Sequence, residues 1–562
     1  MASATAFAIS KMIYAAVGGG ALRYVQAVCA KRFGSSCTPQ SQVLSGLQQT
    51  HCGKKDSGFT ANGHDNISNG DKNMNTISRI LLIAAAASLV SLAGCVNQKE
   101  EVMHYRKVLH SKPATSSAQL IVPSQLTLAA ALKLANDNNE QLAIAGENYL
   151  QAMIAKDKAF STFMPTVGVG AQDFQMHEFN TSGMPAGVSQ FFQTHYFNVP
   201  LQTQLNVNVL KDATAISAAG AYVNQRKALL LDLQSNLLLE VAQTYYQVLS
   251  DQRSVAVLRQ TLRVQQANVK SQTNKEKAGV ALQLSVLQSQ ADEASTRVQL
   301  TQAENNVDKG RATLAFLIGV PTLNGTHLIN QFNPPHRISD LARLDQIALV
   351  KRQDLLAADD AVITAERNVS AAIDEYFPSV SVDFNTFLYK EQFPSDSWWS
   401  GLFSANFPIF EGGMIYQNIR TAYSQMRQAM LQRQLLARQI MEQVRIARTD
   451  WLTSVRLVAN LKTEMRSAQA AYHQAQHSYS AGVATNLDVI TAQDLALSAQ
   501  LAYQQARYDQ RVRMLNLLRQ TGRFNYPMIA RLALSSRKSL PSRCRLSAKK
   551  LQLTYQTAQA LR

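Results

Sequence analysis

Hydrophobic residues recur every three or four positions through two long segments that contain no proline. The first segment lies between Pro200 and Pro321, and the second lies between Pro408 and Pro527. In the first, the spacing is followed by Leu230, Leu233, Leu237, Val241, Tyr245, Val248, Val255, Leu258, Leu262 and Val269. Such a repeat forms the apolar seam of a coiled coil, and a proline would interrupt the helix that carries it.

This pattern predicts a very long helix followed by a shorter antiparallel partner. We expect the first helix from about 209 to 273, which at 1.5 Å per residue is about 100 Å long. Gly279 marks a reversal, and the second helix is expected over about 282–317. The outward positions are rich in Gln, Asn, Ser and Arg, as expected of a solvated face. Helices of this length indicate a rod or a tube rather than a compact globule.

Two short segments bracketed by prolines, 165–200 and 378–408, alternate between apolar and polar residues instead. Alternation with period two is typical of β-strands. Each segment contains a polar turn, at 180–189 in the first and 392–397 in the second. The expected strands lie at 166–171 and 380–387, with return strands at about 191–209 and 398–410.

These two hairpins have the length of membrane-crossing β structure, which takes roughly ten residues per strand. Phe191, Phe192, Trp398 and Trp399 lie near the turns, where the aromatic belt of a membrane interface would be. An ordinary soluble hairpin with aromatic packing is the alternative. Four strands cannot close a barrel, and an open sheet edge cannot face lipid. Membrane hairpins would therefore form a barrel shared between chains, with eight strands from two chains or twelve from three.

The order of these elements occurs twice, which indicates a tandem duplication. Ala278-Gly279-Val280-Ala281 matches Ala481-Gly482-Val483-Ala484 at a separation of 203 residues. At the same separation, Leu284, Gln290, Ala303, Leu314 and Gly319 match Leu487, Gln493, Ala506, Leu517 and Gly522. We place the first repeat at 125–320, with its hairpin at about 164–209, and a linker at 321–340. The second repeat is placed at 341–525, with its hairpin at about 377–413.

Net charge does not favour a nucleic-acid partner, although the whole chain of 562 residues carries +17. Residues 1–73 account for +4 of this charge and residues 523–562 for +9, which leaves only +4 for the body. We interpret the tail 526–562 as a basic, disordered segment. We interpret residues 1–73 as a non-native or over-extended reading frame, because a signal sequence begins only at Met74.

The five cysteines all lie outside residues 96–543, and Cys95 has a distinctive context. A short basic stretch from Met74 is followed by an apolar stretch, 80–92, which is too short to span a bilayer as a helix. It ends in Leu92-Ala93-Gly94-Cys95, which resembles the lipobox of bacterial lipoproteins. That resemblance implies a signal peptide at 74–94, a diacylglycerol and an acyl chain such as palmitate on Cys95, and a lipidated segment at 95–124. Val96 favours sorting to the outer membrane.

Together, the lipobox, the duplicated body and the paired Ala-Gly-Val tips resemble the TolC-like outer-membrane efflux proteins, in particular the lipidated OprM/NodT-like branch. The resemblance covers about 95–525 and includes 126–164, where Leu128, Ala131, Leu132, Ala135 and Leu142 open the first repeat. It implies a mainly α fold with a small β part. The long α-helical coiled-coil tunnel would join a twelve-stranded barrel shared by a homotrimer in outer-membrane lipid. It also implies a periplasmic adaptor protein and an inner-membrane pump of the proton-driven RND type as partners, with no enzymatic activity and no cofactor besides the covalent lipid.

The family's periplasmic gate lies where its helix pairs reverse. Tyr479 and Gly482 match its pattern, Asp488 takes the first acid position, and Thr491 replaces the second acid. Three copies of Asp488 would form a ring that attracts cations, and repulsion within the ring would raise their pKa values. A solvated residue at a helix start is the alternative interpretation of Asp488.

The first repeat departs from the gate pattern, with Glu276 in the Tyr position, Ser285 opposite Asp488, and Lys275 and Lys277 at the tip. Gly279 and Gly482 would be the adaptor-contact tips, again by resemblance.

No catalytic motif accompanies these features. His473 and His477 are spaced to bind a metal from one helix face, but no third ligand follows nearby, so we interpret them as exposed polar surface. The leading hypothesis is a passive export duct for small molecules such as drugs and other toxic compounds. A lipid-anchored coiled-coil scaffold and a type I protein-secretion duct are the alternatives.

Overall fold

The computed structural model describes residues 97–111, 123–177, 193–330, 340–394 and 396–525. Its helices are α4 (Gln98–Val108), α5 (Leu128–Asn138), α6 (Glu140–Ser161), α7 (Val209–Lys277), α8 (Gln283–Leu317), α9 (Leu341–Lys351), α10 (Gln353–Ile373), the 3₁₀ turn η2 (Asp374–Tyr376), α11 (Met414–Ser480) and α12 (Asn486–Gln520). Its strands are β1 (Gln125–Thr127), β2 (Thr166–Val169), β3 (Gln172–Gln175), β4 (His195–Val207), β5 (His327–Ile329), β6 (Ser379–Lys390) and β7 (Trp399–Asn406). This part of the chain is mainly α, as predicted.

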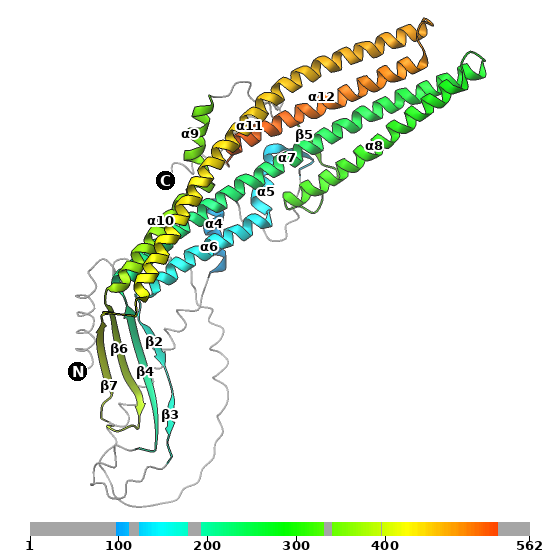
Figure 1. Cartoon of the computed structure of the whole chain (residues 1–562). Coiled ribbons are helices and arrows are strands. Elements are labelled where there is room, and N and C mark those ends of the chain that lie inside the picture. Colours follow the sequence, from blue (N-terminus) through cyan, green and yellow to red (C-terminus); the bar gives the residue numbers. More distant parts are fainter. Residues whose placement is uncertain (1–96, 112–122, 178–192, 331–339, 395, 526–562) are drawn as a thin grey trace, which may run out of the picture. The chain divides into compact units, whose positions relative to one another are not determined.

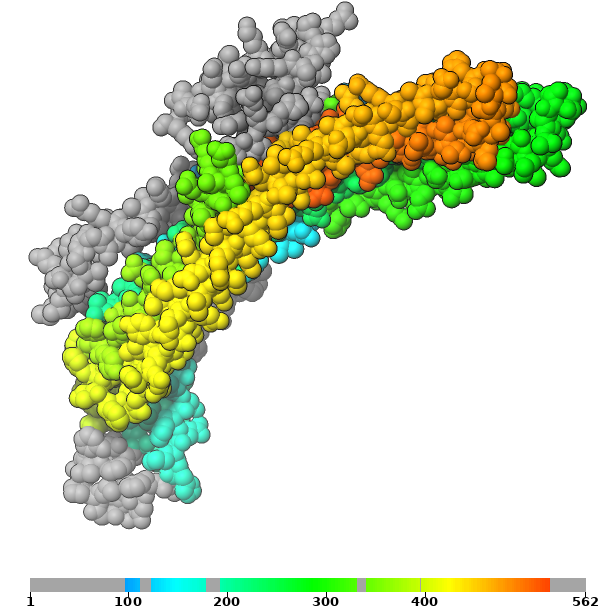
Figure 2. Space-filling model, turned by 45° about the horizontal axis from the view of Figure 1, so that its top comes forward, coloured from blue at the N-terminus to red at the C-terminus, as the bar shows by residue number. Residues whose placement is uncertain are grey.

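Two long helical hairpins make up most of the described residues: α7 with α8, and α11 with α12 (Figure 1). Helix α7 has 69 residues and α11 has 67. The apolar seam predicted from the heptad spacing is buried along α7, for example at Leu237, Val241 and Leu258. The two hairpins pack against one another through α12 and α7, and Figure 2 shows them side by side.

The strands predicted in the two hairpin segments form one antiparallel sheet in the order β2-β4-β6-β7, with β3 also paired to β4. The sheet lies at the end of the helices where α7 begins, opposite the hairpin tips (Figure 1). Its two outer edges, β7 on one side and β2 with β3 on the other, have no strand partner within the described residues.

The outgoing arm of the first hairpin is two short strands, where the alternation predicted one. The break at Gly170 and Ala171 lies opposite Val199 and Pro200, where the pairing of β4 with β6 also shifts register. Proline has no backbone N–H to donate, so a central strand tolerates it only at such an irregularity. The expected turn at 180–189, together with Phe191 and Phe192, lies outside the described residues.

In the second hairpin the expected strand and turn are present, with β6 ending at Lys390 and β7 starting at Trp399. Strand β7 ends at Asn406, four residues earlier than predicted. Trp398 and Trp399 are 49% and 65% exposed.

The largest apolar core gathers where the two repeats meet, away from the hairpin tips. It joins α4, α5 and α6 to the middle of α7 and the ends of α8 and α12, and Leu132, Leu238, Leu314 and Leu515 in it are 0% exposed. Tyr245 fixes α7 to the small parallel sheet of β1 and β5. Its hydroxyl lies 2.8 Å from the Leu126 carbonyl oxygen and accepts from the Ile329 N–H at 3.0 Å. Strand β5 is thus an ordered element within the segment expected as a linker.

Two glycines at the junction occupy equivalent positions in the two repeats. Gly319 and Gly522 follow α8 and α12, both with positive φ, at +68° and +65°. A Cβ on Gly319 would lie 2.8 Å from the Asn138 carbonyl oxygen, and one on Gly522 would lie 2.8 Å from the Lys351 carbonyl carbon. Helices α8 and α12 therefore both end at a glycine that packs against the backbone between two shorter helices of the same repeat. These are α5 and α6 in the first repeat and α9 and α10 in the second.

Several expectations concern residues outside the description. The extension 1–73, the signal peptide 74–94, Cys95 and the tail 526–562 are among them. Part of the segment 95–124 is described and forms α4, which packs against α6. Among the described helices, none carries an apolar stretch long enough to span a bilayer.

Candidate gate at the helix tips

Both hairpins reverse through the same glycine-based turn. Gly279 and Gly482 have φ of +73° and +75°, in the left-handed region that glycine adopts without strain. The Val280 N–H donates to the Lys275 carbonyl at 2.9 Å, and the Val483 N–H donates to the Ser478 carbonyl at 2.9 Å. These bonds define a Schellman motif, which satisfies carbonyl groups left free at a helix end.

The turns project side chains away from the rest of the chain. Val280, Leu282 and Val483 are 75%, 73% and 83% exposed, and a Cβ added to either glycine would meet no neighbouring side chain or backbone within 4 Å. The tips predicted from the paired Ala-Gly-Val sequences are therefore turns with an open apolar surface.

Tyr479 links the two hairpins just inside these tips. Its hydroxyl lies 3.0 Å from Gln272 Nε2 and 3.1 Å from Gln272 Oε1, so it exchanges hydrogen bonds with the amide across α11 and α7. Lys275 Nζ donates to the same hydroxyl at 3.2 Å and lies 4.4 Å from the centre of the tyrosine ring. The ammonium group over the ring adds a cation–π attraction.

A buried polar layer continues this link into α8 and α12. Gln272 Nε2 donates to Asn486 Oδ1 at 3.0 Å, and Asn486 Nδ2 donates to Ser289 Oγ at 3.1 Å. Gln272, Asn486 and Ser289 are 1%, 5% and 2% exposed. Helices α7, α8, α11 and α12 are therefore joined near the tips by hydrogen bonds instead of apolar packing.

Sequence reasoning missed this layer because it assigned the glutamines of α7 to a solvated face. Gln265 and Gln272 follow Leu258 at steps of seven, which is the spacing of the buried seam. The signal that could have predicted the buried layer was a polar residue at a position where the seven-residue spacing of the seam expects an apolar one.

Asp488 has a local role that accounts for its position. The Thr485 N–H and Oγ donate to Asp488 Oδ2 at 2.8 and 2.7 Å, and the Asp488 N–H donates back to Thr485 Oγ at 3.3 Å. This capping box satisfies the free N–H groups that begin α12. The hydrogen bonds from Thr485 lower the pKa of Asp488, whereas repulsion in a ring of three copies would raise it.

Thr491 and Asp488 are both exposed, and neither contacts Tyr479 in the hydrogen bonds of one chain. Thr491 Oγ donates to the Leu487 carbonyl at 2.9 Å, one turn earlier in α12. The structure therefore joins Tyr479 to Gln272 and Lys275, while the predicted acid and threonine positions line a separate, open face of α12.

The remaining candidates at the tips are surface residues. His473 and His477 are both exposed, and the described residues contain no group of three or more His, Cys, Asp or Glu side chains placed to hold a metal. In the first repeat, the Ser285 carbonyl accepts from Asn486 Nδ2 at 3.4 Å, so this position contributes to the polar layer through its backbone.

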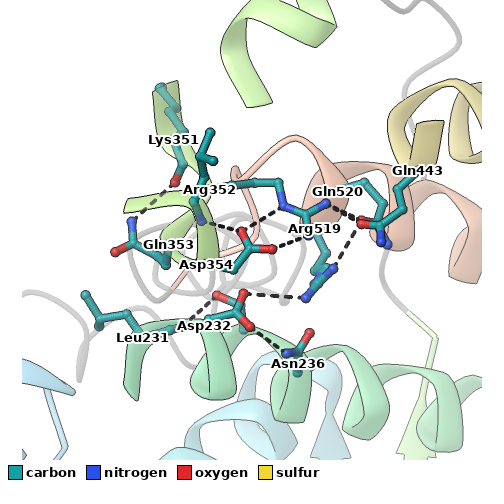
Figure 3. Close-up of polar contacts among 12 residues, drawn as sticks. Leu231, Asp232, Asn236, Lys351, Arg352, Gln353, Asp354, Gln443, Arg519 and Gln520 are labelled. Atoms are coloured by element: carbon teal, nitrogen blue, oxygen red, sulfur yellow. Dashed lines mark hydrogen bonds and ion pairs between the residues drawn. The ribbon is translucent and has the colours of Figure 1, made fainter. Parts of the chain in front are cut away.

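A second polar cluster clasps the two repeats at the junction (Figure 3). Arg352, 4% exposed, binds both carboxylate oxygens of Asp354 at 3.0 and 2.5 Å and donates to Gln443 and Gln520 at 2.6 and 2.8 Å. Arg519 Nη2 lies 3.4 Å from Oδ1 of Asp232, which belongs to α7. Burial raises the pKa of Asp232, which Arg519 partly opposes.

A cavity of about 550 Å³ lies beside this clasp. Its lining includes the clasp residues Asp232, Arg352 and Arg519. The clasp joins α10 to α11 and α12 through Arg352, and α12 to α7 through Arg519, so we interpret it as a structural link between the repeats.

Comparison with known proteins establishes the family. The model of the outer membrane efflux protein family matches residues 131–320 and 344–523, which are the two repeats. The chain belongs to the outer membrane efflux protein family. Membership confirms the resemblance predicted from the duplicated body, and it assigns the chain to efflux channels of the outer membrane.

Individual members of the family are distant in sequence. The outer membrane efflux protein BepC of Brucella suis biovar 1 (strain 1330) is 22% identical over 317 residues, covering 55% of this chain and 68% of BepC. Nodulation protein T of Rhizobium leguminosarum bv. viciae is 24% identical over 293 residues, covering 51% of this chain and 59% of its own length. The crystal structure of the outer membrane protein VceC from Vibrio cholerae has a TM-score of 0.61 and 19% identity, covering 70% of this chain and 96% of VceC. The shared fold confirms the predicted combination of long helices and a small β part.

Proposed function

We propose that this chain is the outer-membrane duct of a tripartite efflux system, a passive homotrimer that exports small toxic molecules. In this proposal a periplasmic adaptor and an inner-membrane pump of the RND type supply the substrate and the energy. The duct itself performs no chemistry, and the lipid on Cys95 adds a second attachment to the outer membrane.

The observation that carries the trimer is the open antiparallel sheet. Strand β7 has exposed apolar side chains, with Leu402 and Phe403 at 62% and 69%, and its outer edge has no partner within the described residues. In lipid every backbone N–H and C=O must be paired, so such edges require neighbouring strands. Four strands from each of three chains close a barrel of twelve, wide enough to leave a lumen, whereas two chains give a small filled barrel.

The adaptor contact is supported by the tips. Gly279 and Gly482 hold two matching turns whose valines are exposed, a surface suited to a partner that also presents helical hairpins. The gate is proposed at the same end, where Tyr479 closes one hairpin on the other and where Asp488 and Thr491 line α12. Three chains would place three such surfaces around one opening.

Native mass spectrometry on protein extracted from outer membranes in mild detergent tests the assembly. We expect a trimer of chains that begin at Cys95 and carry a triacyl mass. A Cys95→Ala variant is the control, and it should remain trimeric while losing the lipid mass. A monomer that begins at Met1 without lipid would overturn the duct as proposed.

Export of small molecules is tested in cells that lack the chain. We expect such cells to become more sensitive to small toxic compounds, and we expect re-expression to restore resistance. Loss of a secreted protein with unchanged sensitivity would instead identify a protein-secretion duct.

The gate is tested by leak of large antibiotics into cells that carry substituted channels. Asp488→Ala removes both a charge and the helix cap, whereas Thr485→Ala removes the cap alone, and Asp509→Ala removes a carboxylate far along α12. We expect leak to increase for Asp488→Ala and to stay near wild type for the other two. Equal leak in Thr485→Ala and Asp488→Ala would show that the cap, not the charge, matters.

A further inference from the structure

The cavity of about 550 Å³ beside the clasp is lined mainly by four parts of the chain. These are the end of α4, the first half of α7, the turn between α9 and α10, and the end of α12. Figure 3 shows the turn from Lys351 to Asp354 beside Asp232 of α7 and Arg519 of α12. The volume lies within the range of about 300–1,000 Å³ that is usual for small-molecule sites.

Three lysines line this cavity, and each comes from a different element. Lys107 lies in the last turn of α4, Lys227 lies in α7, and Lys351 is the last residue of α9. Within the described residues, the side chains of these three lysines make no ion pair and no hydrogen bond. The cavity therefore gathers three ammonium groups that the chain itself does not neutralise in its described part.

The acids in and beside the cavity are already paired with arginines. Among the described residues of the lining, Asp232 is the only acid, and it lies 3.4 Å from Arg519. Asp354, just outside the lining, forms an ion pair with Arg352. No carboxylate in this part of the chain is left to balance the lysines.

The segments that continue from the cavity walls also lack acids. Residues 112–122 follow the end of α4, and residues 526–562 follow Asn525 of the lining. Neither segment contains Asp or Glu, whereas both contain basic residues. Because these segments would add positive charge to the cavity, they favour a bound anion as the source of the counter-charge.

Helix dipoles account for part of the lysine placement but not for all of it. Lys107 and Lys351 lie in the last turns of α4 and α9, where a cation interacts favourably with the carbonyl end of the helix. Each helix end supplies only about half a negative charge, and Lys227 lies well inside α7. The N-terminus of α10, which attracts anions, also reaches the cavity, since its first residue Gln353 belongs to the lining.

The type of cation indicates the type of anion. Arginine binds a planar carboxylate through two parallel hydrogen bonds, but both arginines of the lining already hold an aspartate. A lysine ammonium is a compact point charge that also binds phosphate. Three ammonium groups around one cavity suit an anion that concentrates several negative charges on phosphate groups.

The distance from the sheet favours a soluble anion over a lipid head group. Lys227 lies 18 residues after Val209, where α7 begins next to the sheet (227 − 209 = 18), which is about 27 Å along the helix. Head groups of a membrane around the sheet would lie far from the three lysines. This step rests on the proposed position of the sheet in the outer membrane.

We propose that the cavity is a binding site for a soluble anion that carries phosphate groups, held by Lys107, Lys227 and Lys351. The bound anion neutralises the lysines and links α4 to α7 and to the turn between α9 and α10. Binding itself does not require the chain to act as a duct.

The site is tested with pyrophosphate as the probe, by isothermal titration calorimetry of the purified full chain. We expect saturable binding that weakens as salt is raised, because salt screens the attraction between charges. Bound pyrophosphate should also raise the thermal unfolding midpoint, since it binds the folded chain. Absence of saturable binding would overturn the site.

Substitution of lysine by glutamine locates the binding. Lys107→Gln, Lys227→Gln and Lys351→Gln should each weaken binding by about fivefold, and the triple variant by about 100-fold. Lys309→Gln is the matched control, because Lys309 is an exposed lysine of α8 outside the lining, and it should bind like wild type. Equal weakening by Lys309→Gln would reduce the effect to the net charge of the chain and remove the site.

Lysine acetylation, followed by mass spectrometry, gives a second readout and identifies the source of the phosphate. Pyrophosphate should slow the acetylation of Lys107, Lys227 and Lys351 and leave Lys309 unchanged. Protection by vesicles that contain phosphatidylglycerol, but not by pyrophosphate, would assign the lysines to a lipid head group and overturn the soluble anion. Vesicles of a neutral lipid are the control for that comparison.

The site and the duct can fail separately. A chain that binds pyrophosphate at the three lysines but forms no conducting pore in planar bilayers would keep the site and remove the duct. A conducting pore that binds no pyrophosphate would leave the duct intact and remove the site.

Discussion

The two ends of the long hairpins are held together by different forces. At the junction of the repeats, α7, α8 and α12 bury fully apolar side chains such as Leu238, Leu314 and Leu515. At the tips, the same helices meet through Gln272, Asn486 and the hydroxyl of Tyr479. Apolar burial has no substitute in water, whereas each of these hydrogen bonds can be exchanged for one to water.

This difference indicates which end of the hairpins moves. Separation at the junction would expose a large core and cost far more free energy than separation at the tips. Helices can therefore be anchored at one end and parted at the other without unfolding. The following predictions compare identical substitutions at the two ends.

Leucine truncation on α12 should give the largest contrast. Leu515→Ala leaves a cavity in the junction core, and a fully buried leucine typically costs about 2–5 kcal/mol when truncated. Leu487→Ala near the tip removes a side chain that is 52% exposed and should stay within about 0.5 kcal/mol of wild type. Denaturant unfolding of the purified protein measures both, and equal losses would contradict an anchored junction.

Replacing the glycines after α11 and α12 with alanine distinguishes the free-energy cost of backbone strain from the cost of a steric clash. Gly482→Ala forces alanine into the left-handed region with open space around it, at a cost of about 1–2 kcal/mol. Gly522→Ala carries the same strain and also places a Cβ 2.8 Å from the Lys351 backbone, so its loss should be larger. The difference between their thermal unfolding midpoints reports the packing part, and no difference would mean that the junction backbone yields freely.

Removing a tyrosine hydroxyl at each end compares the free energy lost with a hydrogen bond at the junction with that lost at the tips. Tyr245→Phe leaves the buried Leu126 carbonyl without this donor and the part-buried Ile329 N–H without its acceptor, and should cost about 1–3 kcal/mol. Tyr479→Phe removes the link to Gln272 near solvent and should cost about 0.5–1.5 kcal/mol, yet it should increase channel conductance. If conductance rose for Tyr245→Phe and not for Tyr479→Phe, the contact that opens the channel would lie at the junction and not at the tips.

The sequence predicts the repeated helices well because their signal is long and local. The seam from Leu230 to Val269 and the matched turns at Gly279 and Gly482 each rest on spacing within one segment. Leu128, Ala131, Leu132, Ala135 and Leu142, which the family resemblance placed at the opening of the first repeat, are buried in the structure.

Features that depend on distant partners were not predictable in this way. The break between β2 and β3 follows from Pro200 on the strand opposite, and the clasp of Arg352 joins residues from both repeats. Polar residues in the seam, such as Gln272, look like surface residues until a partner such as Asn486 is known. Asp488 was assigned by family resemblance, whereas the spacing from Thr485 to Asp488 already indicated a capping box.

The smallest predicted effect concerns the capping box formed by Asp488, which depends on pH. Hydrogen bonds from Thr485 lower the pKa of Asp488, so the cap stabilises the start of α12 above pH 3.8 and is lost only as pH falls below that value. Hydrogen exchange at pH 7 should therefore be faster for residues 486–490 in Asp488→Asn, with no change at the junction end of α12. Unchanged exchange at residues 486–490 in Asp488→Asn would show that the capping box does not hold the start of α12.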